Sequence, residues 1–317
     1  MINFRYHVVS LTAVFLALAI GLVVGTAALN GPLADQLNDR VNGVSNQNKQ
    51  LREQVASMEE EVNRQEDFAK QAAPHLLTGT LEGRRVAVVS LPAANKYADG
   101  VVEMLTLAGA TVTSRLDIQD KLTLPDQNVD LLDLSYEAMP TTVTSLPRNS
   151  DGVETASALL ATVMLDRKSS TLTGTEQADD RTEVFAAFKE KGFLSVVGDV
   201  TGGADAIVVI AGTPTVDRDA AKRNAAVVTL VEQFDAAGPV VLAGNGVAGE
   251  GNAVADVRGD PALNKTISTV DNVYTAQGRI ATVLALVEQL RPASKGGTQK
   301  AGHYGIDAGT LLPELPK

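Results

Sequence analysis

The sequence of 317 residues contains no cysteine and no tryptophan, and aromatic residues make up only 4% of it. Without cysteine the chain forms no disulfide, offers no thiolate nucleophile and holds no metal through thiolate sulfur. A chain without thiols also suits export, because it has nothing to mispair in an oxidising compartment. The scarcity of aromatic rings argues against a surface that binds carbohydrate by stacking.

Histidine is nearly as scarce, and the positions of the three histidines exclude two kinds of site. They are His7, His75 and His303, so residues 84–291 contain none. A Ser-His-Asp triad and a histidine-ligated zinc site are therefore excluded from that stretch.

Methionine is the other soft metal ligand in the chain, and its five copies are scattered, with no two closer than 25 residues. Cu(I) prefers thiolate, thioether or imidazole ligands, so a copper site would have to be assembled by folding alone. We expect no metal and no cofactor. Paired carboxylates such as Asp179 and Asp180 are expected to be solvated, and we expect no catalytic residue.

The chain carries a formal net charge of -11, and the first 29 residues contribute only Arg5 to it. The rest of the chain is therefore strongly acidic. Because an acidic surface repels phosphate backbones, we expect no nucleic-acid partner.

One long apolar run, residues 8–29, dominates the amino-terminal part. Its roughly 22 residues match the length that a helix rising about 1.5 Å per residue needs to cross about 30 Å of hydrocarbon. A cleaved signal peptide is the alternative, because Thr26-Ala27-Ala28 offers small residues, but the run is longer than the roughly 7–15 residues of a signal core. Arg5 precedes the run and the first charge beyond it is Asp35. The positive-inside rule therefore places residues 1–7 in the cytoplasm and the rest outside, anchored in the cytoplasmic membrane by a single pass.

Three small residues recur at every fourth position of this run, at Ala17, Gly21 and Gly25. Such spacing lets two transmembrane helices approach closely and favours pairing of two spans. The alternative is that glycine and alanine are simply common in membrane helices.

A heptad repeat of apolar residues follows the break Asn30-Gly31-Pro32 and predicts a coiled coil over residues 33–76. Valine at a with leucine at d favours a parallel homodimer, and a single buried Asn48 at an a position fixes its register. The alternative is an amphipathic helix that packs on its own globular domain. At about 1.5 Å per residue, the rod would reach about 60 Å from the membrane. The predicted dimer contacts are Leu37, Val41, Val44, Asn48, Leu51, Val55, Met58 and Val62.

The distal end of the heptad repeat is less apolar than the rest, with Gln65, Ala69 and Ala72 at its core positions. Glu61 at g also faces Glu66 at e of the other chain, which is a repulsive pair. We expect the two chains to diverge here and to admit an amphipathic helix of a partner protein. Gln65, Ala69 and Ala72 are therefore the predicted partner-binding residues.

Residues 84–291 alternate between strand and helix patterns, which is typical of an extracytoplasmic α/β domain with a mostly parallel sheet. Residues 120–150 have no clear period and are expected to form a long connection, and residues 292–317 are expected to form a flexible tail. The predicted strands are 84–92, 110–118, 206–211, 239–243 and 266–270, and the predicted helices are 99–109, 153–165, 176–191, 217–236 and 275–290.

The segment Gly244-Asn245-Gly246-Val247-Ala248-Gly249 follows a predicted strand and matches the GxGxxG pattern of dinucleotide-binding sites. Residues 250–260 after it have the composition of a loop, whereas the pattern requires a helix whose first turn holds the pyrophosphate. We therefore interpret the segment as a structural turn and not as a cofactor site.

Four segments carry a resemblance to a known family: RYHVVSLTAVFLALAIG at residues 5–21, GRRVAVV at 83–89, STVDN at 268–272 and GHYG at 302–305. With these segments the chain resembles, from end to end, the actinobacterial MctB/SteB family. The resemblance implies one of two roles. Members are described as copper transporters or copper transport outer-membrane pores. Under the name SteB they are described as septal envelope proteins that act with the cytoplasmic protein SteA in daughter-cell separation and in control of a peptidoglycan hydrolase.

These two roles make different physical demands. A pore through an outer membrane requires a closed barrel of about eight or more strands, because open sheet edges are not tolerated in lipid. This chain instead has one helix of inner-membrane type and buried α/β strands. We therefore favour a non-catalytic, membrane-anchored, dimeric envelope adaptor that regulates a cell-wall hydrolase and has a SteA-like partner on the cytoplasmic side. Copper transport or homeostasis is the alternative, and an enzyme that uses carboxylates is a third interpretation.

Overall fold

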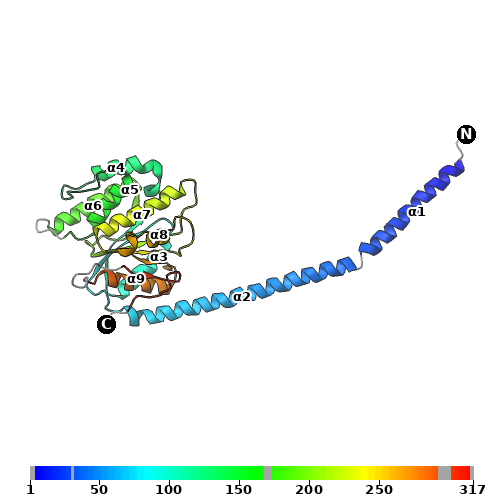
Figure 1. The fold of residues 1–317 in the computed structure, drawn as a ribbon, viewed down its shortest axis with the longest axis horizontal. Coiled ribbons are helices and arrows are strands. Elements are labelled where there is room, and N and C mark those ends of the chain that lie inside the picture. Colours follow the sequence, from blue (N-terminus) through cyan, green and yellow to red (C-terminus); the bar gives the residue numbers. More distant parts are fainter. Residues whose placement is uncertain (1–3, 30–31, 168–172, 292–300, 315–317) are drawn as a thin grey trace. The chain divides into compact units, whose positions relative to one another are not determined.

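The computed structural model describes residues 4–29, 32–167, 173–291 and 301–314. The chain divides into two compact units, residues 1–65 and residues 66–317 (Figure 1). The helix that runs through this boundary contributes its last turns, Glu66–Leu77, to the second unit. We call Glu66–Leu77 the α2 end.

Two helices account for the described part of the first unit. They are α1, Phe4–Leu29, and α2, Pro32–Leu77. Within α1, residues Phe4–Thr26 have a mean hydropathy of 2.6 and are long and apolar enough to cross a membrane. After Arg5 this stretch has no charged residue, so no formal charge opposes its transfer into hydrocarbon. The break at Asn30 and Gly31 lies outside the described residues.

The described residues of the second unit form a seven-stranded sheet with the order β3-β2-β1-β4-β5-β6-β7. Neighbouring strands are parallel except β3, which is antiparallel to β2. The prediction of an α/β unit with a mostly parallel sheet is therefore confirmed. The chain leaves β1 in one direction and returns at β4 to build the other half, so these two strands form the topological switch point. The strands are β1 (Arg85–Ser90), β2 (Thr111–Ile118), β3 (Leu194–Val196), β4 (Ala206–Ile210), β5 (Val240–Ala243), β6 (Ser268–Val270) and β7 (His303–Tyr304).

Helices cover both faces of the sheet, and each face has its own apolar cluster. On β1, Ala87 and Val89 belong to one cluster, and Val86 and Val88 belong to the other. Because strand side chains alternate between faces, burial on both sides explains why the interior of this strand, Val86–Val89, is apolar without interruption. One face carries α3 (Asn95–Leu107), α9 (Ala276–Gln289) and the α2 end; the other carries α4 (Asn128–Glu137), α5 (Gly152–Met164), α6 (Gly174–Glu190), α7 (Ala220–Ala237) and α8 (Ala253–Gly259).

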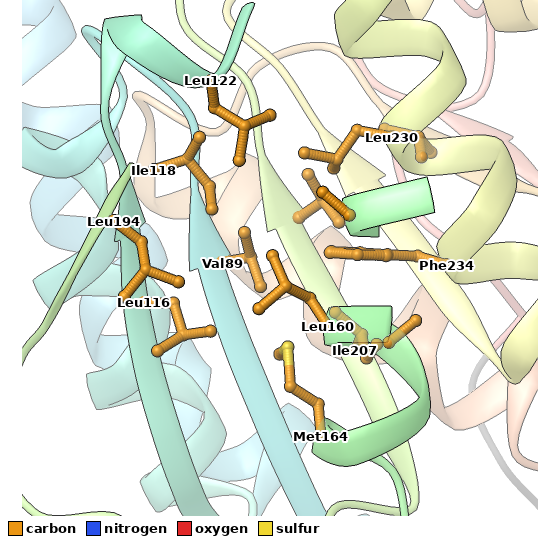
Figure 2. Packing of buried hydrophobic residues seen from close by; sticks show 14 of the residues in the cluster. Val89, Leu116, Ile118, Leu122, Leu160, Met164, Leu194, Ile207, Leu230 and Phe234 are labelled. Carbon is orange, nitrogen blue, oxygen red and sulfur yellow. The ribbon is translucent and has the colours of Figure 1, made fainter. Parts of the chain in front are cut away.

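Large side chains fill the layer between the sheet and helices α5 and α7 (Figure 2). Leu160 and Met164 of α5, Phe234 of α7 and Ile207 of β4 are all fully buried in this cluster. Close packing of this kind leaves little freedom to the helices, and it fixes the strand ends at which the polar sites of the unit lie.

Several connecting segments differ from the sequence-based expectation. Residues 120–150 contain two short 3-10 helices, Asp120–Thr123 and Pro125–Gln127, as well as α4, so they are not only a connection. Residues 250–260 contain α8 where a loop was expected. Residues 301–314 of the expected flexible tail pack on the unit and supply β7. The remainder of that tail, 292–300 and 315–317, lies outside the described residues.

Candidate functional site

The apolar positions of the heptad repeat are exposed along α2 of the single chain. Asn48 is exposed as well, and its amide nitrogen donates a hydrogen bond to the Val44 carbonyl one turn earlier (3.2 Å). A long exposed apolar stripe marks an interaction surface, and the parallel dimer stays a prediction. Exposed fractions between 53% and 69% are found for Leu37, Val41, Val44, Leu51, Val55, Met58 and Val62.

The small residues of the span, Ala17, Gly21 and Gly25, all lie in α1. Among the described residues outside the helix backbone, no atom lies within 4 Å of the place that a β-carbon would take on Gly21 or Gly25. This face is therefore open on the single chain, and its pairing with a second span stays a prediction.

The α2 end packs on the α/β unit, which changes the interpretation of the predicted partner site. Ala69 is only 4% exposed, and Ala73 and Leu77 are fully buried in the same cluster as α3 and α9. Ala72 is half-buried and Gln65 is exposed. Ala69 is therefore not available to a partner helix, because the chain's own domain covers it, as in the alternative of an amphipathic helix that packs on its own domain.

A carboxylate fixes the same segment to the start of α9. Glu66 accepts two hydrogen bonds from the Ala276 amide (2.8 and 3.0 Å), and its carboxylate lies 3.6 Å from the Arg279 guanidinium. A negative charge at a helix amino terminus satisfies a free amide and interacts favourably with the helix dipole. Glu66, which the heptad placed opposite Glu61 of a second chain, thus has a partner within its own domain.

The carboxyl edge of the sheet is where ligands usually bind in this topology, at the switch point between β1 and β4. Here the loop after β1 meets residues 211–215 after β4, and the cavity between them measures only about 40 Å³. A β-carbon on Gly212 would lie 2.6 Å from the Pro92 carbonyl oxygen, so the two loops are in close contact. Ala93 beside them has a φ of 64°, a conformation that is rare for residues other than glycine.

Arg223 of α7 closes this edge further. Its guanidinium is almost buried and forms ion pairs with Asp217 (2.5 Å) and Asp120. Burial opposes the charge of Arg223, but the hydrogen bonds with Asp217 and Asp120 outweigh it and raise the pKa of the guanidinium. The charged groups at the usual ligand position are therefore occupied by one another.

The glycine-rich segment 244–249 follows β5 and not the first strand of the sheet. Gly246 and Gly249 have φ values of 82° and 98°, which glycine adopts readily. Although α8 follows, the Asn252 side chain already accepts hydrogen bonds from the Val254 and Ala255 amides at its start (3.0 and 3.3 Å). Those amides are not free to hold a pyrophosphate, which supports the interpretation of the segment as a structural turn.

The amino edge of the sheet carries a charged pocket of about 740 Å³, which we call the amino-edge pocket. At its centre Arg85 pairs with Asp205 (2.8 Å) and Asp166 (2.7 Å). Hydrogen bonds with these two carboxylates raise the pKa of Arg85; burial opposes ionisation of Asp205, but its bonds with Arg85 prevail and lower its pKa. A volume of this size is within the range of ligand sites, roughly 300–1,000 Å³. Sequence reasoning missed the pocket, because Arg85 and Asp205 are 120 positions apart.

His303 of the expected tail is held in β7 by two hydrogen bonds. Its Nε2 lies 3.1 Å from the Asn264 carbonyl oxygen, which only accepts, so Nε2 carries the proton. Its Nδ1 therefore accepts from the Thr269 hydroxyl (2.8 Å). Burial lowers the pKa of His303 below its ordinary value of 6.5, the positive charge of Arg258 adds to this, and the bond to Asn264 partly opposes it.

We expect stability to fall as the pH drops below about 6.5, and the His303→Gln variant to lose part of this dependence. Between the lowered pKa of the folded state and 6.5, the unfolded chain binds more protons than the folded one, so the free energy of unfolding rises with pH in this window. Urea unfolding midpoints between pH 5 and 7.5 measure the effect. Equal slopes for both proteins would show that His303 does not contribute.

Among the residues that the structure describes, no three histidine, aspartate or glutamate side chains are grouped so that they could hold a metal ion. Met104 and Met164 are buried in the clusters on opposite faces of the sheet. Met104 and Met164 therefore do not lie in one cluster of the described residues.

Comparison with known proteins gives one consistent result. The family model described as "Copper transport outer membrane protein, MctB" matches residues 1–313. The chain is 30% identical over 324 aligned residues to a protein named "Copper transporter MctB" from Mycobacterium tuberculosis, with 98% of each chain covered. It is 29% identical over 329 aligned residues to the protein of the same name from Mycobacterium leprae, with both chains covered completely. The chain therefore belongs to the MctB family.

Proposed function

We propose that this protein is a non-catalytic envelope adaptor, anchored in the cytoplasmic membrane by α1 and dimerised through α2. Its α/β unit lies outside the cytoplasm and regulates a peptidoglycan hydrolase in cell separation. A SteA-like protein on the cytoplasmic side is its second partner. The observation that carries the proposal is the α2 end, which continues the rod into the α/β unit and is fixed there by Glu66 and by the burial of Ala69, Ala73 and Leu77.

The α2 end gives the proposal its mechanical basis. A helix of 46 residues is about 70 Å long at 1.5 Å per residue, a length that suits a domain acting at a distance from a bilayer. The last turns of this helix, Glu66–Leu77, are part of the packed α/β unit. An exposed apolar stripe on α2 together with an α/β unit is suited to presenting a binding surface.

The two edges of the sheet also favour binding over catalysis. At the carboxyl edge, Arg223 is occupied by Asp217 and Asp120, and the cavity between the loops after β1 and β4 measures only about 40 Å³. A second, open cavity of about 260 Å³ lies at the ends of β1 and β2. At the amino edge, Arg85 is engaged in ion pairs with Asp166 and Asp205. An adaptor needs surfaces of this kind and no reactive centre.

Copper transport or homeostasis is the second candidate, and the family description favours it. The buried Met104 and Met164 lie in separate apolar clusters, and among the described residues no three histidine, aspartate or glutamate side chains are grouped to hold a metal ion. A copper role that involves no tight site on this chain is consistent with the adaptor proposal. Tight binding of copper by this chain would contradict the adaptor proposal.

The test is capture of hydrolases by the full-length, detergent-solubilised protein from envelope extracts, followed by a peptidoglycan digestion assay with the captured hydrolase. We expect the protein to raise hydrolase activity roughly 5- to 150-fold, the range of typical coupling between two binding sites. A Cu(I) titration against a competing chelator is the second arm. No capture together with copper binding tighter than about 10⁻⁹ M would overturn the adaptor in favour of the copper role.

A further inference from the structure

We propose that the amino-edge pocket binds a small zwitterion, with an ammonium and a carboxylate group on one carbon, as at the free end of an amino acid. The pocket has about 740 Å³ and is lined by both signs of charge, including Arg84, Arg85, Asp166 and Asp205. Most of these charges neutralise one another. Two groups are left over, and they have opposite sign.

The unpaired positive group is Arg84, which precedes β1 and is exposed. Its guanidinium makes no ion pair or hydrogen bond with any residue that the structure describes. Arg85 beside it is shared by two carboxylates and has no charge to spare. An arginine with a free guanidinium fork binds a carboxylate through two parallel hydrogen bonds, so Arg84 is the anchor for the acidic group of a ligand.

The negative group with a free oxygen is Asp166, although the buried Arg181 guanidinium also lies near this carboxylate. Its Oδ2 atom pairs with Arg85, whereas Oδ1 accepts no hydrogen bond from the described residues. Oδ1 lies next to Gly203, where a β-carbon would approach it to 2.2 Å, so only glycine leaves this oxygen uncovered. With a side chain that is 39% exposed, Asp166 is accessible to an ammonium group in the pocket.

Three helix carboxyl ends strengthen the preference for an ammonium group. Leu165, Gly238 and Leu290 are the residues at which α5, α7 and α9 end, and all three line the pocket. Free carbonyls at a helix carboxyl end carry partial negative charge and favour cations. The partial negative charge of these helix ends also explains why arginines lie here. Arg85 balances the carboxylates of Asp166 and Asp205, whereas Arg84 adds a positive charge that no ion pair among the described residues uses.

The source of the ligand rests on the proposed function. A protein that regulates cell-wall digestion meets peptides with diamino acids, whose side-chain end carries an ammonium and a carboxylate on one carbon. A free amino acid presents the same chemistry. We expect the pocket to bind this pair of groups in either molecule. Binding of a stem peptide that contains diaminopimelate, compared with binding of free diaminopimelate, distinguishes the two sources.

The experiment is isothermal titration of the full-length protein in detergent with meso-diaminopimelate. Pimelate has the carboxylates alone and cadaverine has the ammonium groups alone, so both should bind at least about tenfold more weakly, a difference of about 1.4 kcal/mol. Equal binding of pimelate, or no saturable binding of diaminopimelate below about 10 mM, which corresponds to a binding free energy of only about -2.7 kcal/mol, would overturn the proposal.

Variants assign the two groups. Arg84→Gln and Asp166→Asn should each weaken diaminopimelate binding about tenfold or more, whereas Arg218→Gln, an exposed arginine outside the pocket, should not. If either variant fails to fold, the ligand series on the natural protein still decides. Arg84→Gln protein that loses the ligand but still activates the hydrolase would leave the adaptor proposal intact. Ligand binding without any hydrolase capture would leave the pocket intact and overturn the adaptor.

Discussion

Replacing Asp271 by alanine should lower the free energy of unfolding of the α/β unit by about 3–5 kcal/mol, the usual effect of removing one partner from a buried ion pair. The Asp271 side chain is completely buried and pairs with Arg258 (2.8 Å). It also accepts hydrogen bonds from the amides of Ile306 (2.7 Å) and Asp307 (3.1 Å). Its removal leaves the Arg258 charge without its carboxylate and two amides without an acceptor.

Urea unfolding of the full-length protein, followed by circular dichroism, measures this loss. Asp307→Ala is the matched control, because Asp307 is an exposed aspartate of the same segment and only its backbone takes part in the network. We expect a change within about 0.5 kcal/mol for the control. A similarly small change for Asp271→Ala would show that residues 301–314 contribute little to the stability of the unit.

The strands and helices that the sequence predicts well are those with long patterns. Val86–Val89 of β1 and all of β4 are buried on both faces and apolar throughout, so both strands are recognisable from the sequence of the strand alone. α5 has an aspartate cap, Asp151, followed by regular spacing of apolar residues. Such elements can be predicted from their own residues, without knowledge of the residues that they contact in the fold.

The elements that the sequence does not predict owe their structure to distant contacts. β3 and β7 have three and two residues, too few to show an alternation. α4 has a weak pattern and depends on α5, which it approaches so closely that a β-carbon on Gly152 would lie 2.2 Å from the Asn128 carbonyl oxygen. Only the folded chain creates the environment in which this short helix is stable.

The candidate sites escape sequence analysis for the same reason. The amino-edge pocket depends on Arg85 and Asp205, and the α2 end depends on Glu66 and the Ala276 amide, 210 positions apart. Neither pair has a recognisable spacing. The heptad repeat was recognisable, but a repeat does not say whether an apolar stripe faces a second chain or the chain's own domain. The stripe remains exposed up to Val62 and is covered by its own domain at Ala69.

Because α2 is exposed up to Val62 and covered by its own domain at Ala69, we expect the same substitution to have different effects at Ala69 and at Ala72. Ala69→Glu places a carboxylate in an apolar cluster and should destabilise the α2 end by at least about 3 kcal/mol, as an unpaired buried charge does. Ala72→Glu, at a half-buried position, should change stability by less than about 1 kcal/mol. Hydrogen exchange of the Ala276 amide reports the difference, because Glu66 protects this amide only while the α2 end is in place.

The same pair of variants tests where a hydrolase docks. If the partner helix binds beside the α2 end, Ala72→Glu should abolish capture and activation of the hydrolase while the Ala276 amide stays protected, since the added charge then lies on the docking surface of a folded domain. Ala69→Glu should abolish capture only together with loss of that protection. Normal capture by Ala72→Glu would exclude this surface, and the docking site would then lie elsewhere on the α/β unit. Unchanged protection in Ala69→Glu would contradict the burial of Ala69 on which the distinction rests.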